Sequence, residues 1–159
     1  MANPFQEIRN NQQFYYENTL RKTALFERKQ KLKKVKKWNK LNENQIIKAL
    51  YDDFKKSSEE VRISDIRPVI SEINDALKHL RDWAAPQRVK TPLYLLGSKS
   101  HVTSQPKGLN LIIAPWNFPF NLTIAPMVSA IAAGNCAVLK PSELTPNCKQ
   151  LLVMSVINN

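Results

Sequence analysis

The chain has 159 residues, of which 43% are hydrophobic, and its formal net charge is +11. This length and composition suit one folded domain with a hydrophobic core, and they exclude global disorder. The three glycines are too few and too far apart for a glycine-rich phosphate loop. No stretch approaches the roughly 18 apolar residues of a membrane span, and the N-terminus lacks the apolar core of a secretory signal.

Residues 1–86 have the apolar periodicity of a helical segment. The clearest stripe runs from Ile70 to Trp83 at helical spacing. Pro68 is expected to begin or kink this last helix, and Pro86 is expected to end the segment. Two pairs have the spacing of N-terminal capping boxes: Asn42 with Gln45, and Ser57 with Glu60.

Residues 87–108 change character and favour a short β-hairpin. Two extended runs, 91–97 and 99–105, are expected on either side of a turn at Gly97 and Ser98. The hairpin would connect the helical segment to the last part of the chain.

Residues 109–159 predict one βαβ unit. An apolar run at 109–113 precedes an apolar helix candidate that ends at Gly134, and a second apolar run covers 136–139. Thr145 is expected to cap a further helix. Such strands belong in a parallel sheet with both faces covered. The predicted fold class is therefore α/β: a helical N-terminal segment, a short β-hairpin and the first βαβ unit of an incomplete Rossmann-like parallel sheet.

Ligands of parallel sheets bind beyond the carboxyl ends of the strands, and polar residues follow both predicted strands. Asn117, after the first strand, is typical of a turn residue that satisfies local backbone groups, but a fixed amide can also stabilise an oxyanion. Lys140 and Glu143, after the second strand, are typical of a solvated surface pair. Functionally, such a pair can also bind ribose hydroxyls.

The stretch PWNFPFNLTIAPMVSAIAAGNCAVLKPSE, residues 115–143, resembles the aldehyde dehydrogenase superfamily, and is most similar to its class 3 branch. The resemblance covers nearly the whole chain but only the first part of a typical member. It implies an enzyme that oxidises an aldehyde to a carboxylic acid with NAD or NADP as cofactor, through a thiohemiacetal on a catalytic Cys.

The resemblance also assigns roles beside the first strand. Asn117, in P-W-N, falls on the oxyanion-hole Asn of the family. The backbone around Ile113, Ala114 and Trp116 is implied to line the nicotinamide side of the cofactor site.

Beside the second strand, the motif K-P-S-E carries the implied cofactor contacts. Lys140 and Glu143 fall on the residues that hold the adenosine ribose, and Ser142 is implied to add a contact or a cap. A carboxylate at the ribose favours NAD over NADP because a 2′-phosphate would meet like charge, although class 3 members often take both.

The nucleophilic Cys and the general-base Glu of the family lie downstream of the matched residues. Cys136 is expected to be a small buried hydrophobe, and Cys148 has only a weak claim to reactivity from its place in the first turn of a helix. Because the family nucleophile has no match here, we expect the isolated chain to be inert.

Two cysteines predict no metal site and favour a cytoplasmic setting. The implied partners of the chain are the aldehyde, the remainder of the dehydrogenase and, through the hairpin, a second subunit of a homodimer.

The main alternative comes from residues 28–40, which hold eight Lys and Arg residues and no acid. Such a run is typical of a solvated helix face. It is also compatible with a non-catalytic, basic helical interaction module that binds nucleic acid or an anionic surface. The presence of P-W-N and K-P-S-E in one βαβ unit favours the dehydrogenase, because a binding module needs neither.

Overall fold

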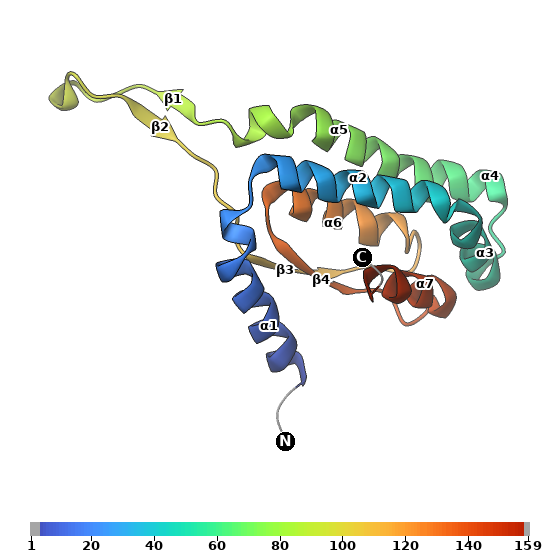
Figure 1. Cartoon of the computed structure of the whole chain (residues 1–159). Coiled ribbons are helices and arrows are strands. Elements are labelled where there is room, and N and C mark those ends of the chain that lie inside the picture. Colours follow the sequence, from blue (N-terminus) through green and yellow to red (C-terminus); the bar gives the residue numbers. More distant parts are fainter. Residues whose placement is uncertain (1–3, 158–159) are drawn as a thin grey trace.

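The computed structural model describes residues 4–157, and its elements follow one another as helices, a hairpin and a βαβ unit (Figure 1). A 3₁₀ turn, Leu20–Lys22, joins the first two helices, and a π-helical turn, Arg62–Ile66, precedes the last helix before the hairpin. Within the described part of the chain, none of the helices is long and apolar enough to cross a membrane. The helices before the hairpin are α1 (Pro4–Asn18), α2 (Leu25–Leu41), α3 (Glu43–Phe54), α4 (Ser58–Val61) and α5 (Arg67–Ala84).

Local signals place the starts of α4 and α5. Pro68 is the second residue of α5, directly after the π-helical turn, so the prediction that it begins or kinks this helix is confirmed. The Ser57 hydroxyl accepts a hydrogen bond from the backbone N–H of Glu60 (3.2 Å), as the capping pattern predicts.

The capping prediction for Asn42 is wrong, although the boundary is right. The Asn42 side chain donates to the carbonyl of Trp38 (2.8 Å) instead of accepting from the next helix. Asn42 alone separates α2 from α3, and its backbone N–H (3.0 Å) donates to the same Trp38 carbonyl as its side chain.

The hairpin pairs β1 (Gln87–Val89) with β2 (Ser100–Val102) in antiparallel register and extends away from the helices (Figure 1). The extended run predicted for residues 91–97 is wrong, because a 3₁₀ turn occupies Leu93–Leu95. The N–H of Leu95 donates to Pro92, and the N–H of Ser98 donates to Leu95. These local bonds use backbone groups that a strand would have paired across the hairpin.

The βαβ unit is formed as predicted. Strands β3 (Leu109–Ile113) and β4 (Cys136–Lys140) are parallel, with Leu109 opposite Cys136 and Ile113 opposite Lys140. Helix α6 (Asn121–Ala133) connects them, and α2, α5 and α6 lie together on one side of this small sheet (Figure 1). Helix α7 (Pro146–Ile157) follows β4. The opposite face leaves Leu111 63% exposed and Ile113 68% exposed.

Two residues shape α6. Pro126 lies inside the helix, beyond the first turn, where it cannot donate to the carbonyl four residues earlier. Gly134 ends the helix at φ 84°, as predicted, and its N–H donates to Ile131 (3.0 Å). The buried Asn135 side chain accepts from the N–H of Gly108 (2.8 Å), which ties the end of α6 to the start of β3.

One hydrophobic core joins the helical segment to the βαβ unit. Phe120, at the start of α6, is fully buried and stacks on Trp38 of α2 with ring centroids 6.4 Å apart. Side chains from α2, α3, α5, α6 and α7 pack around this pair. A division of the chain into domains at 1–86, 87–108 and 109–159 stays a prediction, and residues 1–3 and 158–159 of those ranges lie outside the described residues.

We expect Phe120→Ala to lower the free energy of unfolding by about 3–5 kcal/mol, because it leaves a cavity between α2 and α6. Urea denaturation followed by circular dichroism would measure the loss. Phe26→Ala is the matched control, because Phe26 is 69% exposed on α2. It should change stability by less than about 0.5 kcal/mol. Equal effects of the two variants would contradict this core.

Candidate functional site

The parallel register of β3 and β4 brings the predicted site residues to one edge of the sheet. Ile113 and Lys140 are opposite each other at the carboxyl ends, and the N–H of Ala114 donates to the Lys140 carbonyl (3.1 Å). The loop from 114 to 120 and the loop from 141 to 145 therefore leave the sheet side by side. Two stretches more than 20 residues apart in the sequence thus form a single candidate site.

Asn117 lies exposed at the turn of the first loop. Its backbone carbonyl accepts a hydrogen bond from Lys56 Nζ (3.2 Å). Among the residues that the structure describes, its side-chain amide has no hydrogen-bond partner, so it does not satisfy local backbone groups as a turn residue would. The amide is therefore available to a ligand.

The rest of the first loop is fixed by buried residues on either side of Asn117. Ala114 is 4% exposed before it, and Phe120 is fully buried after it. The exposed residues of the loop edge are apolar: Ile113 at 68% and Trp116 at 55%. The loop therefore has an accessible apolar surface, and its buried residues Ala114 and Phe120 anchor its backbone.

The second loop carries an ion pair at the strand end. Lys140 Nζ lies 2.6 Å from a Glu143 carboxylate oxygen, and the side chains are 53% and 71% exposed. The hydrogen bond from Lys140 lowers the pKa of Glu143 below its ordinary value, so Glu143 is ionised at neutral pH. An exposed pair of this kind contributes little to stability, so a ligand that separates it meets little resistance.

Ser142 has a structural role within the second loop. Its side chain is buried, and Oγ accepts a hydrogen bond from the N–H of Leu144 (3.2 Å). The hydroxyl of Thr145 donates to the Ser142 carbonyl (3.2 Å). These hydrogen bonds stabilise the turn after β4, and a contact of Ser142 with a cofactor stays a prediction.

Helix α7 begins after Thr145 as predicted, but another residue caps it. Asp53, near the end of α3, accepts hydrogen bonds from the backbone N–H groups of Asn147 (3.1 Å) and Cys148 (2.9 Å). A carboxylate at this position satisfies free N–H groups and complements the helix dipole. The Thr145 hydroxyl is occupied by Ser142. The capping prediction failed because the cap comes from 94 residues earlier in the chain.

Besides Asp53, the sequence did not reveal an ion pair that contacts the first loop. Lys56, which is 10% exposed, forms an ion pair with the fully buried Asp65 (Nζ to Oδ2, 3.1 Å) and also binds the Asn117 carbonyl. No motif marks Lys56 or Asp65. The one possible signal in the sequence is the charge of Asp65 close to the apolar Val61 and Ile66. That signal is weak, because charged residues in helices are usually solvated.

Neither cysteine has the properties of a nucleophile. Burial raises the pKa of Cys136, which is 5% exposed. Burial, with added repulsion from Asp53 and Asp65, raises the pKa of Cys148 to about 12. Cys148 is 1% exposed. The prediction that Cys136 is a buried hydrophobe is confirmed, and burial outweighs the helix position that gave Cys148 its weak claim to reactivity.

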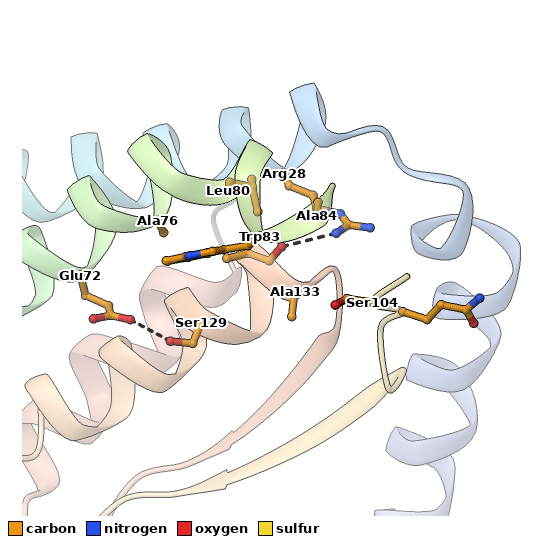
Figure 2. A pocket seen from close by; sticks show the side chains of 11 residues that line it. Arg28, Glu72, Ala76, Leu80, Trp83, Ala84, Ser104, Ser129 and Ala133 are labelled. Carbon is orange, nitrogen blue, oxygen red and sulfur yellow. Dashed lines mark hydrogen bonds between the residues drawn. The ribbon is translucent and has the colours of Figure 1, made fainter. Parts of the chain in front are cut away.

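A cavity of about 350 Å³ lies elsewhere, between α5, α6 and the chain after the hairpin (Figure 2). Arg28 reaches into it and donates to the Ala132 carbonyl (3.4 Å), while Ser129 donates to Glu72 (2.9 Å). Ala132 and Ala133 at the end of α6 line this cavity, whereas the loop with Asn117 leads into the start of α6, so the cavity and the candidate site lie at opposite ends of that helix. It brings together none of the predicted site residues.

The fold and the strand-end groups are those of an α/β chain that builds the start of a Rossmann-like sheet. The family model described as "Aldehyde dehydrogenase family" matches residues 8–159. The chain therefore belongs to the aldehyde dehydrogenase family, as the two motifs predicted.

Individual relatives agree with this assignment. A 4,4'-diaponeurosporen-aldehyde dehydrogenase of Staphylococcus aureus (strain NCTC 8325 / PS 47) is 42% identical over 145 residues, which are 89% of this chain and 32% of that protein. Aldehyde dehydrogenase family 3 member B3 of Mus musculus is 40% identical over 151 residues, 95% of this chain and 31% of that protein. These relatives support the predicted likeness to class 3.

A solved structure shows the same fold. The structure described as the substrate-bound state of Staphylococcus aureus AldH superposes with a TM-score of 0.87 at 39% identity, covering 96% of this chain and 33% of that one. The chain thus spans about a third of the length of the relatives it matches. The alternative prediction of a non-catalytic basic interaction module gains no support from these comparisons.

The buried Cys148 should make the stability of the fold fall at alkaline pH. A thiol with an ordinary pKa near about 8.5 when unfolded loses its proton there, whereas the folded thiol keeps it up to a pKa of about 12. Above pH 8.5 the folded state binds more protons, so stability declines as pH rises from about 9 to 12. We expect a loss of about 3 kcal/mol between pH 8 and 11.

Urea denaturation at several pH values would measure this loss against Cys148→Ala as control. The alanine variant is expected to be less stable at neutral pH but to lose less stability on going from pH 8 to 11. Parallel pH profiles for the two proteins would contradict the raised pKa of Cys148.

Proposed function

We propose that this chain supplies the oxyanion donor and part of the cofactor site of an NAD(P)-dependent aldehyde dehydrogenase. The observation that carries the proposal is the meeting of P-W-N and K-P-S-E at adjacent parallel strand ends in a member of this family. The unpartnered amide of Asn117 supports it, because an oxyanion donor must be free to bind its ligand.

The proposed role of Asn117 follows from charge. When a thiolate attacks an aldehyde, the carbonyl oxygen becomes an oxyanion in a tetrahedral adduct. The side-chain N–H of Asn117 would donate to that oxygen, and a fixed donor of this kind typically lowers the barrier by about 3 kcal/mol. The thiolate and the general base would come from residues that have no match in this chain, since both Cys136 and Cys148 are buried.

The second loop has the donors and acceptors that a ribose needs. Lys140 offers an ammonium and Glu143 an ionised carboxylate, both accessible and both beyond the end of β4. A ribose diol can accept from the first and donate to the second. The dinucleotide, when bound, would accept a hydride from the substrate carbon. Backbone at Ile113, Ala114 and Trp116 would line its nicotinamide side.

The same features support the remaining parts of the proposal. The carboxylate of Glu143 favours NAD, since the 2′-phosphate of NADP would meet like charge. The hairpin tip exposes Leu93, Tyr94 and Leu96 by 84% or more, which suits burial against a second subunit in a homodimer. A cytoplasmic setting stays a prediction from the two unpaired cysteines.

The catalytic role can be tested in a hybrid enzyme, in which this 159-residue chain replaces the matching portion of the Staphylococcus aureus relative. We expect Asn117→Ala to lower kcat for hexanal by about 10²–10³-fold, because the oxyanion loses a donor. The KM for NAD should change by less than about twofold, because uniform binding is untouched.

The matched control is Asn44→Ala, on an exposed position of α3, which should leave both constants unchanged. An Asn117→Ala hybrid that folds and keeps the kcat of the parent would refute the proposed role.

The cofactor role predicts a different change. Glu143→Gln should raise the KM for NAD about tenfold, a loss of the size expected for one hydrogen bond to a charged group. It should also improve NADP relative to NAD, because the repulsion of the 2′-phosphate is removed. Initial-rate kinetics of the hybrid enzyme with each dinucleotide would measure both effects. Asp52→Asn, which removes the exposed Lys48–Asp52 pair, is the control. An unchanged KM and an unchanged NADP preference would count against Glu143.

A further inference from the structure

We propose that Lys56 is a positioning residue for Asn117: its ammonium fixes the loop that carries the oxyanion donor. This inference rests on the proposed function, because positioning matters only if Asn117 acts on the substrate. Lys56 lies just beyond α3, in the helical N-terminal segment and 61 residues before Asn117.

A strained turn directs Lys56 toward the loop. Lys55 ends α3 in the left-handed conformation (φ 60°), and it is the one non-glycine residue with positive φ in the described part of the chain. Lysine rarely adopts this conformation, and such strain persists only where surrounding contacts compensate for it. Lys55 itself donates its backbone N–H to Tyr51 (2.8 Å), and its ammonium lies 4.7 Å from the Tyr51 ring, so the turn before Lys56 is held by contacts of its own.

The ammonium of Lys56 is enclosed by four groups. It donates to Asp65 Oδ2 (3.1 Å) and to the backbone carbonyl of Asn117 (3.2 Å). The rings of Phe118 and Phe54 lie 4.4 Å and 5.7 Å from it, within reach of a cation–π interaction. The Lys56 side chain is 10% exposed, and a charge buried to this degree persists only when it is paired and hydrogen-bonded. One of its two hydrogen-bond partners, the Asn117 carbonyl, belongs to the candidate loop.

The partner carboxylate extends the same contact to the end of the loop. Asp65 Oδ1 accepts a hydrogen bond from the backbone N–H of Asn121, the first residue of α6 (3.3 Å). The Asn121 side chain donates to the Ser64 carbonyl (3.2 Å). The ion pair therefore holds residue 117 directly and residue 121 through Asp65. Between these two points the loop has little freedom, so the backbone that carries the Asn117 amide is held in place.

Asp53 provides an internal comparison, because its carboxylate anchors the chain directly after the second loop. It binds the first N–H groups of α7, directly after the K-P-S-E loop, at 2.9–3.1 Å. Two charged residues at one end of α3 thus hold the two halves of the candidate site separately. Loss of Lys56 should affect the proposed chemistry, and loss of Asp53 should affect the proposed cofactor contact.

The test compares four variants of the hybrid enzyme with Asn117→Ala. We expect Lys56→Met to lower kcat by about tenfold to a hundredfold, since a misplaced catalytic group typically costs up to about 10². Its KM for NAD should stay within about twofold of the parent. Lys56→Arg keeps the charge and should recover part of kcat. Asp53→Asn should instead raise the KM for NAD. Lys48→Met, which removes an exposed pair on α3, should change neither constant.

Hydrogen exchange of residues 114–125 separates positioning from general destabilisation. In Lys56→Met, exchange should accelerate about tenfold in this segment, an increase that reports local opening, and stay unchanged in β4. A folded Lys56→Met enzyme with the parent kcat, while Asn117→Ala is impaired, would overturn this inference alone. Equal falls of kcat in Lys56→Met and Asp53→Asn would also overturn it. An unimpaired Asn117→Ala would overturn the proposed function and this inference together.

Discussion

The parallel pairing of β3 with β4 is the constraint on which the candidate site depends. Because both strands run the same way, their carboxyl ends meet, and the residues that follow each strand become neighbours. An antiparallel pair would have placed Asn117 and Lys140 at opposite edges of the sheet. Helix α6 makes the parallel arrangement possible by carrying the chain back across the helical side, where Phe120 anchors its start in the core.

The helical N-terminal segment does more than cover the sheet. The end of α3 reaches the candidate site through Lys56 and Asp53, each held at hydrogen-bond distance from a different loop. A charge is expensive to bury, so the enclosed Lys56–Asp65 pair beside the first loop indicates that these groups are held in place. The shared core and these two contacts make the segment part of the site rather than an appended scaffold.

The fold and part of the site could be predicted from local patterns. Apolar runs at 109–113 and 136–139 indicated the strands, and Gly134 indicated the end of the helix between them. Two failures concern hydrogen-bond partners, and one concerns an element. The Asn42 side chain donates to the end of α2 instead of capping α3, and Asp53 instead of Thr145 caps α7. The hairpin tip forms a 3₁₀ turn instead of a strand. In each case a side chain or a backbone group had two possible partners, and the pattern of residues alone does not rank them.

What the sequence by itself determined is the family, the α/β class and the residue types at the strand ends, because periodicity and short motifs are local properties. Only the tertiary structure decided which of these residues are free and which are held. Asn117 keeps an unpartnered amide, Ser142 is used as a turn cap, and the thiol of Cys148 is buried beyond reach. The physical reason is that burial and hydrogen-bond satisfaction depend on which neighbours are present. For Asn117 and Cys148 some of those neighbours lie 61 and 95 residues away in the chain, and for Ser142 the partner is a local backbone group that the pattern of residues does not single out.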